Sequence, residues 1–124
     1  MAIILSHRIR DKEFGSSIPD EARDILQRTA RVALATPIAS RGLRPGTRLL
    51  KAYATSAHGP RRVVYLLAVE SADLFLLFYR DKNDAVGANV SPQNPAFRTQ
   101  LQKHLALLHE DITTNSVDVI EVKG

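Results

Sequence analysis

Positively charged side chains flank the most apolar segment of this chain, which lies within residues 59–84. Arg61 and Arg62 precede the apolar run, and Arg80 and Lys82 follow it. Guanidinium and ammonium groups bind phosphate oxygens, and an arginine can do so through two parallel hydrogen bonds. If the fold brings these four cations together, they form a binding surface for a ligand that carries phosphate groups.

The apolar segment itself predicts a β-hairpin. Residues 62–69 and 74–80 are rich in valine, leucine and aromatic residues, and only a short connection separates them. A short connection favours antiparallel pairing of the two strands. Both alternating faces of the strands are apolar, so we expect other parts of the chain to cover the hairpin on both sides.

The register of this hairpin places its charges at one end. If the chain turns near residues 71–72, residues whose numbers add up to about 143 lie opposite each other. Arg62 then faces Asp81, and Arg61 faces Lys82. Like charges that face each other destabilise a sheet by roughly a few tenths of a kcal/mol per pair. A compensating partner is therefore expected at this end.

A third strand, predicted over residues 47–54, adds side chains to the same end of the sheet. The chain turns over at residues 56–60, which brings Tyr53 and His58 to that end and leaves Lys51 one step further in. The end then combines cations, an imidazole and tyrosine rings.

Two interpretations of this charged end remain open. In the first, Asp81 and Asp84 neutralise part of the cluster, and the end is an ordinary solvated strand end. In the second, the end binds RNA, because arginine forks suit backbone oxygens and tyrosine rings suit unstacked bases. Histidine as a residue type can also transfer protons near neutral pH. The residues concerned are Arg61, Arg62, Arg80, Lys82, His58, Tyr53 and Tyr79.

The segments on either side of the three strands predict helices. The helix within residues 16–37 starts at Ser17 or Pro19, carries acids in the first turns, and repeats apolar residues at three- and four-residue steps. Residues 94–112 follow an Asn-Pro helix start, with apolar residues at positions 97, 101, 105, 108 and 112. Residues 2–9 are expected to form a first strand, and residues 113–124 a last edge strand or a loose tail. The predicted fold is a single α+β domain over residues 1–124, with a small antiparallel sheet, one or more N-terminal helices and a C-terminal helix.

Composition narrows the class of protein. The chain has no cysteine, which excludes a disulfide framework and thiolate zinc sites and predicts an intracellular, cytoplasmic protein. No apolar run is long enough to cross a bilayer, so no membrane association is expected. The net charge is +4, and residues 41–82 carry eight Lys/Arg against three Asp/Glu. An anionic partner fits this excess.

The hairpin strands carry two short motifs in a fixed order. Gly-Pro-Arg-Arg-Val-Val-Tyr spans residues 59–65, and Tyr-Arg-Asp-Lys-Asn spans residues 79–83. With the flanking elements, they resemble the RelE/ParE superfamily of type II toxin-antitoxin toxins, especially the HigB-like members. Those sequences commonly show a Gly-x-Arg-Val-Ile-Tyr strand and then a strand that ends in Tyr-x-Lys-Asn. The resemblance covers about residues 43–112.

The resemblance implies a small antiparallel sheet with helices on one side and a concave RNA-binding surface on the other. Relatives of the RelE branch cleave mRNA on the ribosome, and a cognate protein antitoxin neutralises them. The implied chemistry needs no metal or other cofactor. The RNA 2′-hydroxyl attacks the adjacent phosphate, which leaves a cyclic phosphate and a 5′-hydroxyl, and the reaction needs a proton acceptor, cations and a proton donor.

The resemblance also implies roles for individual residues. Arg62 occupies the strand arginine that stabilises the scissile phosphate, and Lys82 does likewise or assists proton transfer. Lys51 lies where relatives carry catalytic or RNA-binding lysines, and His58 is the further catalytic candidate. The expected RNA-binding residues are Arg61, Arg80, Tyr79, Tyr53 and Arg48.

One departure from the family and two rival functions accompany this hypothesis. Residues 83–95 contain no tyrosine or histidine, although some relatives place a catalytic one there, so the general acid is unassigned. A ParE-like protein would instead inhibit DNA gyrase and cleave nothing. A regulatory RNA-binding protein would use the same basic face without catalysis. The N-terminal helix and the edge at residues 117–122 are the candidate antitoxin surfaces.

Overall fold

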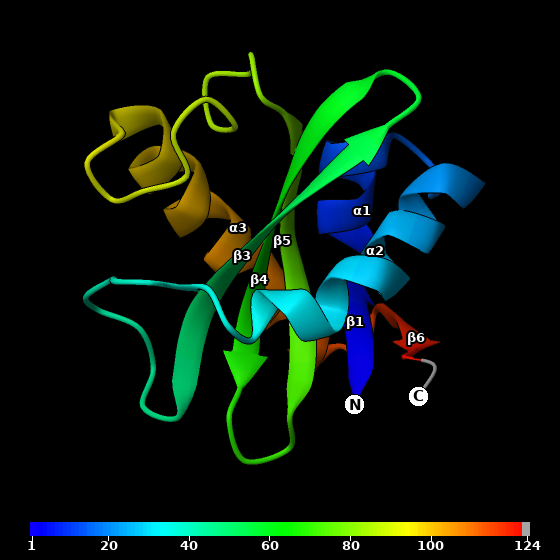
Figure 1. The fold of residues 1–124 in the computed structure, drawn as a ribbon. Coiled ribbons are helices and arrows are strands. Elements are labelled where there is room, and N and C mark those ends of the chain that lie inside the picture. The colour runs from blue at the N-terminus through cyan, green and yellow to red at the C-terminus, as the bar shows by residue number, and fades with distance from the viewer. Residues whose placement is uncertain (123–124) are drawn as a thin grey trace.

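A computed structural model describes residues 1–122, which form one six-stranded sheet and three helices (Figure 1). The strand order is β2-β3-β4-β5-β1-β6. Strands β1 and β5 are parallel, whereas the other neighbours are antiparallel. The α+β class is confirmed, but the sheet is mixed rather than purely antiparallel. In chain order the elements are β1 (Ala2–Ser6), α1 (His7–Phe14), α2 (Asp20–Ala33), β2 (Pro37–Ile38), β3 (Thr47–Ser56), β4 (Gly59–Ala68), β5 (Asp73–Asp81), α3 (Pro95–Thr113) and β6 (Val117–Glu121).

Helices cover both faces of the sheet. Neighbouring residues of β4 point to opposite faces: Tyr65 joins the apolar cluster under α2, and Val64 joins the cluster under α3. In Figure 1, α2 lies in front of the central strands and α3 behind them. The prediction that the hairpin is covered on both sides is confirmed. The arrangement implied by the family resemblance, with all helices on one face, is not what the structure has.

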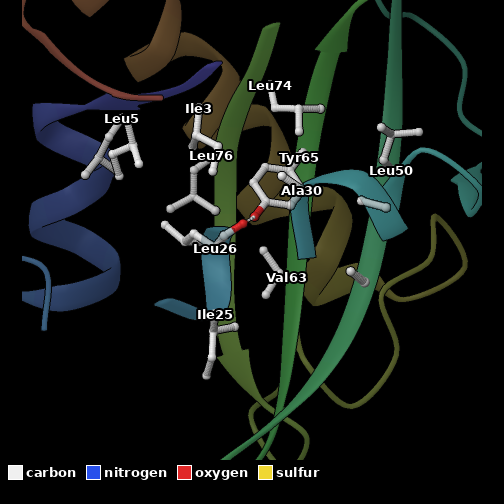
Figure 2. Packing of buried hydrophobic residues seen from close by; sticks show 13 residues of the cluster. Ile3, Leu5, Ile25, Leu26, Ala30, Leu50, Val63, Tyr65, Leu74 and Leu76 are labelled. Atoms are coloured by element: carbon white, nitrogen blue, oxygen red, sulfur yellow. Dashed lines mark hydrogen bonds between the residues drawn. The ribbon is translucent and has the colours of Figure 1, made fainter. Parts of the chain in front are cut away.

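Helix α2 follows its predicted apolar stripe. Its first turn carries Asp20 and Glu21, which favour the positive end of the helix dipole. The buried stripe packs on the sheet, where the hydroxyl of Tyr65 donates a hydrogen bond to the Leu26 carbonyl at 3.2 Å (Figure 2). The apolar face of α2 is therefore core and is not open to an antitoxin. The stripe consists of Ala22, Ile25, Leu26, Ala30 and Ala33.

Helix α3 starts as predicted but turns a different face inward. The Asn94 side chain accepts a hydrogen bond from the backbone of residue 96, and Pro95 occupies the first turn. The buried residues are Phe97, Leu101, His104, Leu108 and Asp111, whereas Leu105 is half-buried and Ile112 is 47% exposed. The predicted stripe at 105 and 112 was thus wrong, because His104 and Asp111 are buried instead. His104 contacts Glu13 on α1, and Asp111 accepts a hydrogen bond from Ser6 at the end of β1.

The N-terminal segment contains a helix that the pattern did not predict. The strand expected over residues 2–9 ends at Ser6, whose side chain caps α1 by accepting from the Ile9 N–H. Ser6 in turn donates a 2.5 Å hydrogen bond to buried Asp111, which also accepts from the Arg8 N–H. The capping carboxylate comes from the far end of the chain, so local sequence does not reveal it.

The C-terminal segment, predicted to be either an edge strand or a loose tail, forms an edge strand. Strand β6 pairs with β1 from Val117 to Glu121, and its outer edge has no strand neighbour within residues 1–122. Over the same described residues, no helix combines the length and apolar character needed to cross a membrane.

Candidate functional site

The charged residues meet at the end of the sheet where the β3–β4 hairpin turns and β5 finishes, at the top of Figure 1. Arg61 lies opposite Asp81, and Arg62 lies opposite Arg80. The predicted register was therefore off by one residue. The connection between the strands covers residues 69–72 rather than 70–73, and a β-bulge follows at Val64/Tyr65.

Alternation along the strands divides this end between the two faces of the sheet. Lys51, Tyr53, Arg62 and Arg80 belong to the face that α3 covers, because they pair with or alternate with its core residues. Arg61 and Tyr79 belong to the α2 face. The structure thus forms two groups where the sequence predicted one.

The α3-side group contains a stacked cation and a second cation beside one tyrosine, and we call these three residues the rim site. The Arg62 guanidinium carbon lies 4.2 Å from the centre of the Tyr53 ring, and the Lys51 ammonium lies 5.6 Å from it. Tyr53 is 55% exposed. Within residues 1–122 neither Lys51 nor Arg62 forms an ion pair. Their charges are therefore available to an anionic ligand.

Arg80 lies next to Arg62, but carboxylates occupy its fork. Its Nε and Nη2 atoms donate to the two oxygens of Glu13 at 2.7 and 2.8 Å, and Nη1 donates to Asp84 at 3.2 Å. The Glu13 carboxylate is fully buried and also contacts His104 Nε2 at 3.0 Å. This group of Glu13, Arg80 and His104, here called the buried network, compensates the like charges of Arg62 and Arg80.

Two opposing effects set the pKa of Glu13. Burial alone would raise that pKa, but hydrogen bonds from His104, Arg80 and the Tyr79 N–H outweigh burial and lower it. Burial acts against the charge of Arg80 as well, yet contact with Glu13 raises the Arg80 pKa. Glu13 and Arg80 are therefore both charged, and each binds the other rather than a ligand. His104 Nδ1 has no hydrogen-bond partner among the described residues.

The α2-side group is paired and packed. Arg61 donates to Asp81 at 3.1 Å and lies 6.0 Å from the Tyr79 ring centre, while Phe14 packs on that ring at 5.1 Å. Burial raises the pKa of the Tyr79 hydroxyl. The Asn83 N–H and then Arg61 hold the pKa of Asp81 below its ordinary value. Neither Arg61 nor Tyr79 presents a free group comparable to Arg62.

The remaining predicted residues lie at different distances from the rim site. Lys82 directly follows β5, is exposed, and forms no ion pair within residues 1–122. His58 is exposed at the tip of the β3–β4 hairpin, roughly 13 Å along the strand from Arg62. Arg48 lies about five residues, or roughly 17 Å, from Tyr53 along β3, and on the α2 face. The structure does not bring Arg48 to the site.

The arrangement can hold phosphates and support a base, but none of the three rim-site residues is a histidine or a carboxylic acid. Arg62 and Lys51 supply positive charge for phosphate groups, and the exposed Tyr53 ring supplies an apolar surface for a base. Sequence reasoning missed Glu13, which holds the Arg80 guanidinium, and His104, which contacts Glu13. A polar residue at 104, three residues after Leu101 and four before Leu108 on the core stripe, was the available signal.

Within the described part of the chain, no three His, Asp or Glu side chains are grouped so that they could hold a metal ion. Comparisons with protein-family models, with curated proteins and with solved structures found no match for this chain.

Proposed function

We propose that this protein binds single-stranded RNA at the rim site and cleaves it, as the toxin of a type II toxin-antitoxin system that acts on mRNA at the ribosome. The observation that supports this proposal is the unpaired state of Lys51 and Arg62 around exposed Tyr53. Elsewhere on this end, Arg61 and Arg80 are neutralised by carboxylates. The RelE-like motifs described above agree with the same position for the site.

The proposed chemistry assigns a role to each free cation. The RNA 2′-oxygen forms a bond to phosphorus, the bond from phosphorus to the 5′-oxygen breaks, and a 2′,3′-cyclic phosphate and a 5′-hydroxyl result. Arg62 neutralises the charge that develops on the non-bridging oxygens. Lys51 holds a neighbouring phosphate, and exposed Lys82 binds phosphate or assists proton transfer. A cognate protein antitoxin would restrain this activity.

The decisive experiment maps mRNA 5′ ends after the protein is induced in growing cells. Wild-type protein is expected to generate new internal ends and to stop growth. Arg62→Ala should lower cleavage by about 10²-fold or more, because removal of one transition-state donor costs that much. Lys82→Ala should also lower it. Arg48→Ala is the matched control, because Arg48 is an exposed arginine on β3, at the opposite end of the β3–β4 hairpin from Arg62.

The rival functions predict different results. A regulatory RNA-binding protein would protect RNA without cutting it, and this alternative is favoured because none of the three rim-site residues is a histidine or a carboxylic acid. A gyrase inhibitor would produce DNA damage signals that do not depend on Arg62 and Lys82. Intact mRNA and normal growth on induction of the wild-type protein would refute the proposed cleavage.

RNA binding can be tested apart from cleavage. Contact with three phosphates predicts a slope of about −2 for the logarithm of the binding constant against the logarithm of salt concentration. Arg62→Ala should make that slope shallower by about 0.7, whereas Arg48→Ala should leave it unchanged. A binding constant that does not respond to salt would contradict the assignment of a phosphate site.

A further inference from the structure

A groove runs between α3 and the loop that joins β2 to β3. It consists of two adjoining hollows of about 780 and 410 Å³, which share Gly42, Leu43, Gln102 and Leu105 among their lining residues. The lining of α3 extends from Phe97 to Ile112, which corresponds to roughly 22 Å or four helical turns. We call this the α3 groove.

The floor of the α3 groove is aliphatic and partly exposed. Leu105 and Ile112 have the spacing of core residues, yet Leu105 is half-buried and Ile112 is 47% exposed. They lie in the groove because His104 and Asp111 take the buried positions of α3. Leu43 and Leu66 continue the same surface from the loop and from β4. Leu105 and Ile112 are thus left uncovered, although the apolar periodicity of the helix predicts that they lie in the core.

The rim of the groove is basic. The residues that line the two hollows include Arg41, Arg44 and Arg98 but no aspartate or glutamate. Arg44 contacts His109 Nδ1 at 2.9 Å, and Arg98 donates to the Pro92 carbonyl, so both keep their positive charge unneutralised. Arg41 is exposed and forms no ion pair within residues 1–122. Charge complementarity therefore calls for an acidic occupant.

The chemistry of the floor favours a protein over a nucleic acid. No tyrosine or tryptophan lines the groove, and Phe97 is fully buried. The one exposed ring among the lining residues is the His109 imidazole, whose Nδ1 lies 2.9 Å from Arg44, so the groove lacks the run of exposed rings on which successive bases stack. An aliphatic floor that follows about four turns of α3 matches a second helix that packs beside it. The lining shares no residue with the rim site or with Lys82.

We propose that the α3 groove binds an amphipathic helix of a partner protein, which places leucine or isoleucine side chains on the floor and aspartate or glutamate side chains against the basic rim. This surface differs from the two candidate partner surfaces that the sequence suggested, the α2 stripe and the β6 edge. Its binding does not depend on RNA cleavage at the rim site.

A selection experiment tests the proposal without a known partner. A phage-displayed library of random 16-residue peptides is selected on the full-length protein, and the enriched peptides are synthesised with a fluorophore for anisotropy titration. Enriched peptides are expected to repeat apolar residues at three- and four-residue steps between acids. Arg41→Glu and Ile112→Ser should each weaken their binding by about tenfold.

Two exposed residues of α2 supply control variants for this experiment. Arg31→Glu and Val32→Ser change an exposed arginine and a 60% exposed valine on α2, and they should alter binding by less than about twofold. The proposal is overturned if no peptide is enriched, if enriched peptides are basic or lack helical periodicity, or if the groove variants bind as well as wild type. It is also overturned if RNA cross-links to the groove, or if sedimentation shows a dimer that Ile112→Ser dissociates. Groove variants should retain RNA binding, so failure here leaves the rim site unaffected.

Discussion

Substitution of the buried carboxylate at the centre of the buried network should cost much more stability than the same substitution on the surface. Glu13→Gln keeps the size of the side chain but removes the charge that Arg80 and His104 contact at 2.7–3.0 Å. Loss of one partner of a buried ion pair costs about 3–5 kcal/mol. The Arg80 side chain is 20% exposed and keeps Asp84 as a partner, so we expect a cost just below that range, about 2–3 kcal/mol.

Urea unfolding followed by circular dichroism measures this cost. The matched control is Glu110→Gln, which removes the same charge from an exposed pair with Arg8, where both side chains are more than half exposed. Such pairs contribute less than about 1 kcal/mol. If Glu13→Gln costs no more than Glu110→Gln, the reasoning that Glu13 anchors Arg80 in a buried site is refuted.

A double substitution separates the lost charge from the lost packing. Glu13→Gln leaves the Arg80 cation without its main partner, and Arg80→Met removes that cation. The double variant should therefore be more stable than the sum of the two single effects predicts, by about 1 kcal/mol or more. Additive effects would mean that Arg80 does not depend on Glu13 in the folded protein.

Three further predictions concern pH and two tyrosines. Hydrogen bonds outweigh burial and hold the pKa values of Glu13 and Asp111 below their ordinary range. Their contribution to stability is therefore present above pH of about 4 and is lost as pH falls through the folded pKa values. The melting temperature should fall when thermal unfolding is measured from pH 7 down to pH 3. A melting temperature that stays constant over this range would contradict the direction of the two pKa shifts. Tyr65→Phe should lower the free energy of unfolding in urea by about 1 kcal/mol, because it removes the hydroxyl that bonds to Leu26 and Thr29 and keeps the ring. An unchanged free energy would show that these hydrogen bonds do not stabilise the fold. Tyr53→Ala should weaken RNA binding by about fivefold or more and Tyr53→Phe by much less, because the ring face rather than the hydroxyl supports a base; equal losses in anisotropy titrations would oppose stacking.

The elements that could be predicted from sequence are those whose signals are local. The three central strands follow from an apolar segment with short connections, and β3, β4 and β5 lie within about three residues of their predicted bounds. The Asn94 cap and Pro95 mark the start of α3 without help from any distant residue. The parallel position of β1 beside β5 could not be predicted, because no short connection links those strands.

The errors arise where a distant residue decides the local outcome. Helix α1 begins after Ser6 because Asp111, more than one hundred residues away, accepts hydrogen bonds at its first turn. Helix α3 turns His104 inward because Glu13 is buried opposite it. Apolar periodicity assumes that polar residues face water, and paired polar groups in a core break that assumption.

The same reasoning explains why the candidate site could be located but not resolved from the sequence. Position along the strands brings Arg61, Arg62 and Arg80 to one end of the sheet, and strand periodicity is enough to predict this. Whether each cation is available depends on carboxylates elsewhere in the chain: Glu13 lies 67 residues before Arg80, and Asp81 lies 20 residues after Arg61. Arg62 differs from both because it stacks on Tyr53 and meets no carboxylate in residues 1–122. A phosphate replaces water around such a cation, but it must displace a carboxylate from a paired one, so we expect binding energy to concentrate at Arg62 and Lys51.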